Sequence, residues 1–215
     1  EITGTGYIHN SGGTIDADTI NVTRDITNTS TIITDKITAD SLQNDGTIKA
    51  SADAVDNVLS ELNVRKFTNS GTLTVTNANV SESVTNSGTL TLDKIGSAEN
   101  LVNIENQSNG NLTVNGDVFG NFFSGGNNGN MTVNGTVTGY GYFSYNKNAS
   151  LTADKLVVTA DGWNAIYGKV DVNNMVVNGT MAVLTDKLDV ANTTNINANL
   201  QFRAESGKSK LNNVN

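Results

Sequence analysis

The chain contains no cysteine and no proline, and only 6% of its 215 residues are aromatic. The lack of cysteine excludes the disulfide frameworks that hold many small secreted domains together, so the chain must gain its stability from repetition and burial. The lack of proline suits a fold in which nearly every backbone N–H group is needed for hydrogen bonds between strands. Charged residues are also scarce, at 16% against about 25% in typical soluble domains.

The charge balance and the short apolar runs exclude two classes of partner. The formal net charge is −8 and no basic stripe is present, so neither nucleic acid nor an anionic membrane surface is an expected partner. No apolar run approaches the ~18 residues of a membrane-spanning helix, so we expect no membrane insertion by this fragment. The chain starts at Glu1 without a signal peptide, which predicts a mature or excised fragment.

The residues that usually carry catalysis are nearly absent. His9 is the single histidine, and we expect it to be an exposed or turn residue, because no orienting partner is visible beside it. There is no Cys/His cluster for a metal and no nucleotide-binding or nucleophile motif. The sequence therefore predicts no catalytic, cofactor-binding or metal-binding residues and no cofactor.

What the chain does contain is repetition in asparagine, threonine and glycine, of which it has 34, 28 and 21. The clearest repeats are NSGTLTV at Asn69–Val75 and NSGTLTL at Asn86–Leu92. Looser copies are Ser11–Ala17, Asn44–Ala50, Ser108–Val114, Asn127–Val133, Lys147–Ala153 and Val177–Val183. Internal repetition of this kind is typical of solenoids.

The spacing of the repeats sets the fold prediction. The first apolar residue of each copy recurs every 16 to 25 residues, at Ile15, Ile32, Ile48, Leu73, Leu90, Leu112, Met131, Leu151 and Val170. About 20 residues accommodate three short strands and three turns. We predict an all-β fold, a right-handed parallel β-helix of about ten rungs. Residues 1–204 would form one elongated domain and 205–215 a tail or the start of a further segment.

Within GTLTV, Leu73 and Val75 share one face and Thr72 and Thr74 share the other, since side chains alternate along a strand. We expect the apolar face inside the coil and the Asn-Gly pairs at its corners, where glycine and asparagine tolerate positive φ. Equivalent asparagines in successive rungs are expected to form hydrogen-bonded ladders. The alternative interpretation is that Asn-Gly marks β-hairpins.

Two stretches depart from the repeat. In Ser51–Lys66, Val55, Val58, Leu59 and Leu62 follow helical spacing, which predicts a short helix extruded at 52–64, with a long strand pair as the alternative. The second stretch holds Phe119, Phe122, Phe123, Tyr140, Tyr142, Phe143 and Tyr145, followed by Trp163 and Tyr167. These rings form either a stack inside the coil or an exposed binding surface made of Tyr140, Tyr142, Tyr145, Trp163 and Tyr167.

Parallel β-helices include polysaccharide lyases and hydrolases, and glycosidases use pairs of carboxyl groups. Asp16 with Asp18, or Asp154 with Asp171, are conceivable catalytic pairs, yet nothing in the sequence singles them out from structural acids on a solvated face. A regular outward Thr-x-Thr pattern would indicate an ice-binding solenoid. Here the pattern is lost after a few rungs, which argues against that function.

The NSGTLTV, NSGTLTL and Val-Asn-Gly repeats, without cysteine or proline, resemble the passenger domains of autotransporters of type V secretion, especially AIDA-like self-associating adhesins. The resemblance covers most of Ile15–Leu200. It implies a secreted rod on the bacterial cell surface, anchored to the outer membrane through segments other than these. The lack of a catalytic cluster predicts that the chain is not an enzyme.

Three functions follow as hypotheses. The first is an adhesin or self-associating rod that attaches cells to each other or to a host glycan or protein through a repetitive polar face. The second is a glycan-active β-helix enzyme, and the third is a passive structural spacer.

Overall fold

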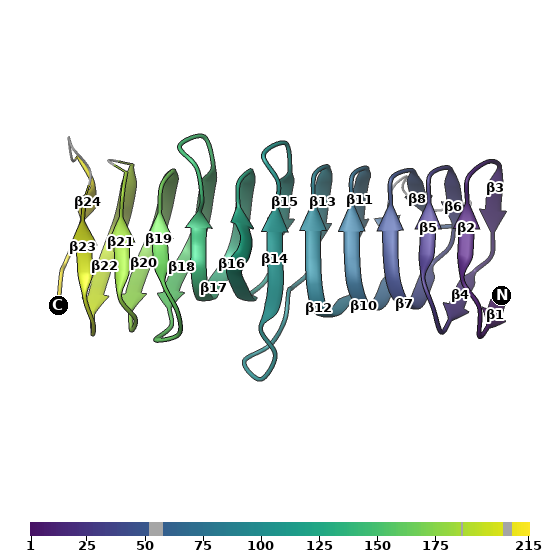
Figure 1. Ribbon diagram of the computed structural model, residues 1–215, viewed down its shortest axis with the longest axis horizontal. Coiled ribbons are helices and arrows are strands. Elements are labelled where there is room, and N and C mark those ends of the chain that lie inside the picture. The colour runs from purple at the N-terminus through teal and green to yellow at the C-terminus, as the bar shows by residue number, and fades with distance from the viewer. Residues whose placement is uncertain (52–57, 186, 204–207) are drawn as a thin grey trace.

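Short segments in which Ile, Leu or Val alternate with Thr, Asn or Asp form strands, and the strands wind into a parallel β-solenoid of about ten turns. The computed structural model describes residues 1–51, 58–185, 187–203 and 208–215. Figure 1 shows the coils stacked into a rod with the two termini at opposite ends. The all-β, parallel β-helix prediction is confirmed, and no described residue is helical.

Most strands are short, and those of nine or more residues bend across a corner. In chain order they are β1 (Ile2–Gly4), β2 (Ile8–Asn10), β3 (Thr14–Asp16), β4 (Thr19–Val22), β5 (Ile26–Asn28), β6 (Thr31–Ile33), β7 (Lys36–Asn44), β8 (Thr47–Lys49), β9 (Val58–Leu59), β10 (Glu61–Asn69), β11 (Thr72–Val75) and β12 (Ala78–Asn86). They continue with β13 (Thr89–Leu92), β14 (Val102–Asn106), β15 (Asn111–Val114), β16 (Val118–Asn127), β17 (Asn130–Ser144), β18 (Ser150–Val158), β19 (Asn164–Ile166), β20 (Lys169–Val177), β21 (Met181–Val183), β22 (Leu188–Ile196), β23 (Leu200–Phe202) and β24 (Lys210–Leu211).

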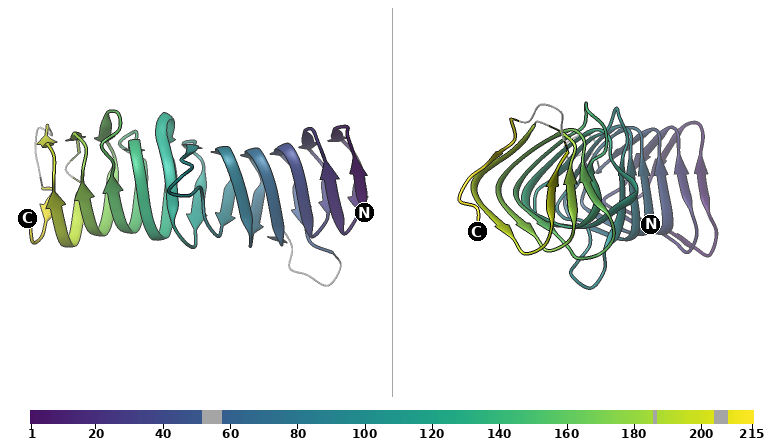
Figure 2. Two further views of the ribbon diagram at one scale, coloured as in Figure 1. Left: turned by 90° about the horizontal axis from the view of Figure 1, so that it is seen from below. Right: turned by 60° about the vertical axis from the view of Figure 1, so that its left-hand side comes forward.

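Each coil contributes a segment to each of three faces. In the right-hand view of Figure 2 the coils lie one behind another. The threonine face consists of β3, β6, β8, β9, β11, β13, β15, β24 and the first residues of β17, β18, β20 and β22. The asparagine face consists of β2, β5, β14, β19, β21, β23 and the last residues of β7, β10, β12, β16 and β17. The third face contains β1, β4 and the remaining parts of the long strands.

The core is built from columns of equivalent apolar residues. On the threonine face, Leu73, Leu90, Leu112, Met131, Leu151, Val170 and Leu188 pair in register from one coil to the next. All of these side chains are at most 1% exposed, so the repeat phase predicted from the sequence is confirmed. Met181, the first apolar residue of the looser copy Val177–Val183, is not part of this column and lies on the asparagine face in β21.

A ladder of seven buried asparagines runs up one inner corner of the coil. Each side-chain amide donates to the amide oxygen of the next, at distances of 2.9 to 3.1 Å. The members are Asn10, Asn28, Asn44, Asn69, Asn86, Asn106 and Asn127. The predicted asparagine ladder is therefore confirmed, and the buried amides are satisfied by one another and by backbone carbonyls.

The glycines of the NSG corners have a different role from the one predicted. Gly71 and Gly88 are not among the glycines with positive φ. Instead, the turns stack so closely that a Cβ on Gly88 would lie 2.1 Å from the carbonyl oxygen of Gly71. The corner requires glycine because the backbone of the neighbouring coil occupies the space of a side chain.

The helix predicted at 52–64 is wrong over its described part. Residues 52–57 lie outside the described residues, but Val58–Leu59 and Glu61–Asn69 are strands β9 and β10. Leu62 pairs in parallel with Ile37 on one side and Ala78 on the other. Because both neighbouring coils offer strand partners, pairing decides the conformation against a short-range helical spacing.

The C-terminal segment adds a further partial coil. In β24, Lys210 pairs with Asp189 and Leu211 with Val190, and Val214 forms a bridge with Thr194. Residues 208–215 therefore stack on the preceding coil.

Candidate functional site

The aromatic-rich stretch is divided between the inside and the outside of the coil. Phe122 and Phe143 are fully buried, with ring centroids 5.2 Å apart. Phe123 and Tyr145 are 50% and 44% exposed. The interior stack and the exposed surface, which the sequence posed as alternatives, both exist here because alternation sends neighbouring residues to opposite sides.

Four of the outer rings form one contiguous cluster. Tyr142 lies at its centre, with ring centroids 5.7 Å from Phe123, 4.5 Å from Tyr145 and 6.3 Å from Tyr167. Tyr145 and Tyr167 meet edge to face at 6.0 Å. These separations lie within the range of favourable ring pairs.

The position of these rings follows from the coil. Tyr145 and Tyr167 each follow the residue that ends a strand of the asparagine face, and their N–H groups donate to the carbonyls of Asn127 and Ser144. The equivalent corner position in earlier coils is occupied by small or polar residues, namely Asp45, Ser70, Ser87, Gln107 and Asn128. The corner thus changes from polar to aromatic where the asparagine ladder ends.

Gly141 fixes the entry of the chain into this region. Its φ is 108°, and its N–H donates to the side-chain oxygen of Asn164 at 2.9 Å. A Cβ there would lie 2.5 Å from the backbone of Phe122. Glycine is required for this bend, which places Tyr142 at the start of its strand segment on the asparagine face.

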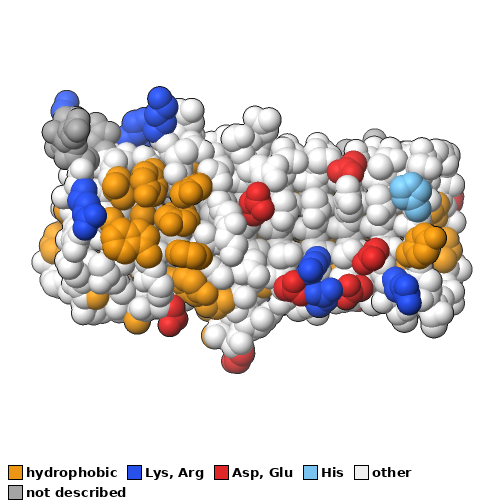
Figure 3. All heavy atoms as spheres, in the orientation of Figure 1, with side chains coloured by type: hydrophobic (Ala, Val, Ile, Leu, Met, Phe, Trp, Pro, Cys, Tyr) orange, Lys and Arg blue, Asp and Glu red, His pale blue; other side chains and the backbone are white. Residues whose placement is uncertain are grey.

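Trp163 and Tyr140 are close to this cluster but make no ring contact with it that we observe among the described residues. Trp163 is 40% exposed, and the guanidinium carbon of Arg203 lies 5.7 Å from its ring centroid. The Tyr140 ring lies beside Gly162, the neighbour of Trp163. We call Phe123, Tyr142, Tyr145, Trp163 and Tyr167 the aromatic patch. Figure 3 shows hydrophobic side chains gathered over the C-terminal half of the asparagine face.

No protein-family model, no curated protein and no solved structure matches this chain.

Small residues continue the patch toward the C-terminus. Tyr142, Ala165, Ala182 and Gln201 occupy one outward column in register. Ala165 and Ala182 are at most 1% exposed although they point outward, and every residue of β19 and β21 is buried. Side chains therefore cover this part of the face on its outer side too, unlike the solvated Thr68 and Thr85 column of earlier coils.

The sequence identified most of the exposed aromatic rings but not the other residues in and beside the aromatic patch. Of the five residues predicted as a binding surface, Tyr142, Tyr145 and Tyr167 come together, Trp163 contacts Arg203, and Tyr140 lies outside the ring cluster. Phe123, Arg203 and the two alanines were missed. The loss of asparagine at Ser144 was an available signal, because it marks where the ladder and its polar corner stop.

The second candidate surface is the outer side of the threonine face. Five threonines pair in register in successive coils, and a parallel row of hydroxyl and amide side chains lies beside them. Asn130 donates to Asn111 at 3.1 Å, and the Ser150 hydroxyl donates to Asn130 at 2.9 Å. The rows are Thr74, Thr91, Thr113, Thr132, Thr152 and Thr72, Thr89, Asn111, Asn130, Ser150.

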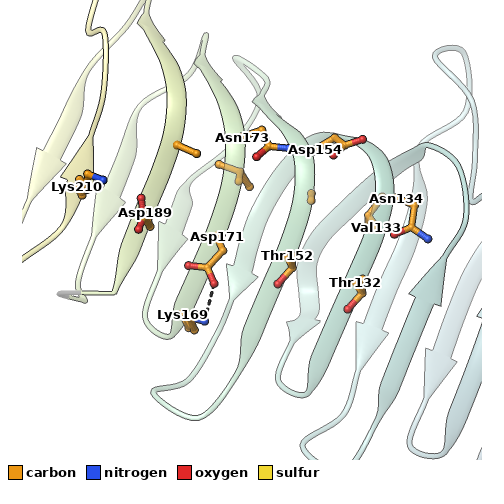
Figure 4. A pocket seen from close by; sticks show the side chains of 13 residues that line it. Thr132, Val133, Asn134, Thr152, Asp154, Lys169, Asp171, Asn173, Asp189 and Lys210 are labelled. Carbon is orange, nitrogen blue, oxygen red and sulfur yellow. Dashed lines mark hydrogen bonds and ion pairs between the residues drawn. The ribbon is translucent and has the colours of Figure 1, made fainter.

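At its C-terminal end the threonine face borders a shallow open groove of about 590 Å³. Figure 4 shows Asp154, Asp171 and Asp189 along it, together with Lys169 and Lys210. Two of these carboxylates are engaged: Asp171 pairs with Lys169 at 2.5 Å, and Asp154 accepts from Asn173 at 3.1 Å. Asp171, with Asp189 beyond it, raises the pKa of Lys169 above its ordinary value.

The groove gathers one carboxylate pair conceived from the sequence, Asp154 with Asp171, whereas Asp16 and Asp18 are exposed near the other end of the rod. His9 is exposed in β2, as predicted. Among the described residues no group of three or more His, Cys, Asp or Glu is placed to hold a metal ion. No helix in the described part of the chain has the length and apolar character needed to cross a membrane.

Proposed function

We propose that this chain is part of a bacterial cell-surface adhesin of the AIDA-like autotransporter kind, a rod that associates with other copies through its threonine face. The observation that carries the proposal is the pair of uncharged polar rows on that face. Between Thr72 and Thr152 the ten outward side chains of these rows carry no charge, in a chain whose net charge is −8. Two copies can approach through this surface without the repulsion that their net charge creates elsewhere.

The rows also supply repeated contacts. Coils stack about 4.8 Å apart, so hydroxyl and amide groups recur at that interval along the rod. A single hydrogen bond between exposed groups contributes little, but a row of them aligned with a second rod adds many weak contacts in one event. Cell–cell attachment through many such rods would then depend on avidity. Attachment to a host glycan or protein through the same rows is the alternative adhesive role.

We propose no enzymatic role. The paired state of Asp154 and Asp171 supports this, because a glycosidase needs one carboxyl free to donate a proton and a second free to act on the sugar. Release of new reducing ends from an acidic polysaccharide, abolished by Asp154→Asn, would overturn this part of the proposal and favour a glycan-active enzyme.

Sedimentation velocity tests the self-association. The chain should sediment faster as its concentration rises, reversibly, and Thr113→Lys with Thr132→Lys should abolish the shift. These two threonines are in-register neighbours on the threonine face. The matched control is Thr68→Lys with Thr85→Lys, in-register neighbours on the asparagine face, which should leave the shift unchanged.

Equal loss in both double variants would show that added charge rather than the threonine face controls association. A chain that stays monomeric at all concentrations, and binds neither host glycans nor host proteins through this face, would favour the passive spacer.

A further inference from the structure

We propose that the aromatic patch, with Lys147 and Arg203 beside it, is a binding site for an acidic glycan. The site is on the asparagine face and does not depend on self-association through the threonine face. Three features of the described residues carry the proposal: the kind of ring exposed, the size of the exposed area and the sign of the neighbouring charges.

The exposed rings are mainly Tyr and Trp, which combine an apolar ring face with a polar edge. A sugar ring is built in the same way, with C–H groups on its faces and hydroxyls around its rim, so it can stack on a ring while its hydroxyls stay hydrated. Tyr145 and Trp163, at 44% and 40% exposure, leave ring surface open for such stacking. Tyr142 and Tyr167 hold Tyr145 in place at 4.5 and 6.0 Å.

The exposed ring area of the aromatic patch is too small for a standard protein–protein interface. An aromatic side chain has roughly 150–250 Å² of surface. With Phe123, Tyr145 and Trp163 at 50%, 44% and 40% exposure, the three together present on the order of 300 Å². A stable protein–protein interface covers about 800 Å² on each partner, whereas a few sugar units need far less.

The charges beside the patch favour an anion. Arg203 lies over the Trp163 ring and its guanidinium donates to Gln201, with no carboxylate partner among the described residues. Lys147 is exposed two residues after Tyr145 and likewise has no carboxylate partner there. Figure 3 shows blue side chains at two borders of the hydrophobic area. In a chain with a net charge of −8, cations left unpaired at an aromatic surface suit a carboxylate-bearing sugar.

Trp163 makes the test direct because it is the only tryptophan of the chain, so its fluorescence reports on the patch alone. The probe is a linear tetrasaccharide of galacturonic acid, compared with a neutral tetrasaccharide of glucose. Titration with the acidic probe should give a saturable change that weakens as salt is added. Tyr145→Ala and Tyr167→Ala should each weaken binding by about tenfold or more, and Arg203→Ala should remove the preference for the acidic probe.

The matched control is Tyr7→Ala, a tyrosine 72% exposed at the other end of the rod, which should bind as the parent chain does. Lack of any saturable change at millimolar probe overturns the proposal. Equal binding of both probes overturns the acidic class. Concentration-dependent association that is lost in Tyr167→Ala shows instead that the patch joins two copies of the chain. Failure of self-association in the threonine-face variants leaves each of these results unaffected.

Discussion

At the residue scale, the buried asparagines are the most demanding feature of this chain. Asn86 accepts from Asn69 at 3.1 Å and donates to Asn106 at 2.9 Å and to the carbonyl of Gly88 at 3.1 Å. All three asparagines are fully buried, so water cannot replace a lost partner. Removing one amide therefore takes a hydrogen-bond partner from each neighbour, although the donating neighbour keeps its bond to a backbone carbonyl.

Asn86→Ala should lower the free energy of unfolding by about 1–3 kcal/mol, because the buried amide oxygen of Asn106 loses its side-chain donor and the amide of Asn69 loses one of its acceptors. Chemical denaturation followed by circular dichroism measures the change. The control is Asn79→Ala, an exposed asparagine in β12, which should change stability by less than about 0.5 kcal/mol. Equal midpoints for the two variants would contradict a stabilising ladder.

At the scale of elements, Arg65 ties three successive coils together on the outside. It lies where β10 shifts register against β12 and donates two hydrogen bonds to Asp40 in β7, at 2.9 and 2.8 Å. Its guanidinium also contacts Glu82 in β12, which Lys66 approaches at 3.2 Å. Arg65 holds the pKa of Asp40 below its ordinary value of 3.8, and Lys66 followed by Arg65 holds the pKa of Glu82 below 4.5.

Arg65→Ala should raise the pKa of Asp40 toward 3.8 and that of Glu82 by less, since Lys66 remains. A carboxyl with a lowered folded-state pKa contributes stability above its ordinary pKa, and that contribution is lost as pH falls through the lowered value. The variant should therefore lose less stability than the parent on acidification through this range. Side-chain carboxyl NMR titration measures both groups, with Arg203→Ala as the control arginine. An unchanged pKa of Asp40 in the Arg65→Ala variant would show that Arg65 does not lower it.

At the scale of the whole molecule, the rod has two parts that share one core. Seven coils carry the asparagine ladder and a polar corner. The next three coils have Ser144, Ile166 and Val183 in place of the asparagine, followed at the corner by Tyr145, Tyr167 and Leu184. Backbone pairing joins each coil only to its neighbours, so stability is close to a sum over coils and interfaces. The end coils have one neighbour where inner coils have two.

Hydrogen exchange should follow that arrangement. Amides of β10–β15, in the middle of the rod, should exchange slowest, and those of β1, β2, β23 and β24 fastest, because end coils open without disturbing the rest. Mass-spectrometric exchange with peptide resolution measures the gradient. The same rate in every coil would show instead that the rod opens only as a whole.

The sequence could predict the coil and most of its interior, since the repeats of Leu, Val and Ile mark one inward residue per turn and the NSG copies mark one corner. It could not predict the strand at Val58–Leu59, because helical and strand spacings overlap in so short an apolar run. It also could not decide which of Phe122 and Phe123 points inward, because the pairing of β16 with β14 shifts register between Asn121 and Gly126, and the neighbouring coil sets that shift.

By itself, the sequence determined that this chain stacks parallel strands and lines its corner with asparagine, because both follow from a period that each coil repeats locally. Only the tertiary structure decided which side chains from different coils meet. The aromatic patch draws on residues from Phe123 to Tyr167, and the Arg203 that borders it comes from a later coil. The physical reason is register: insertions of variable length between coils shift the sequence spacing, while hydrogen bonding between backbones fixes the spacing in space.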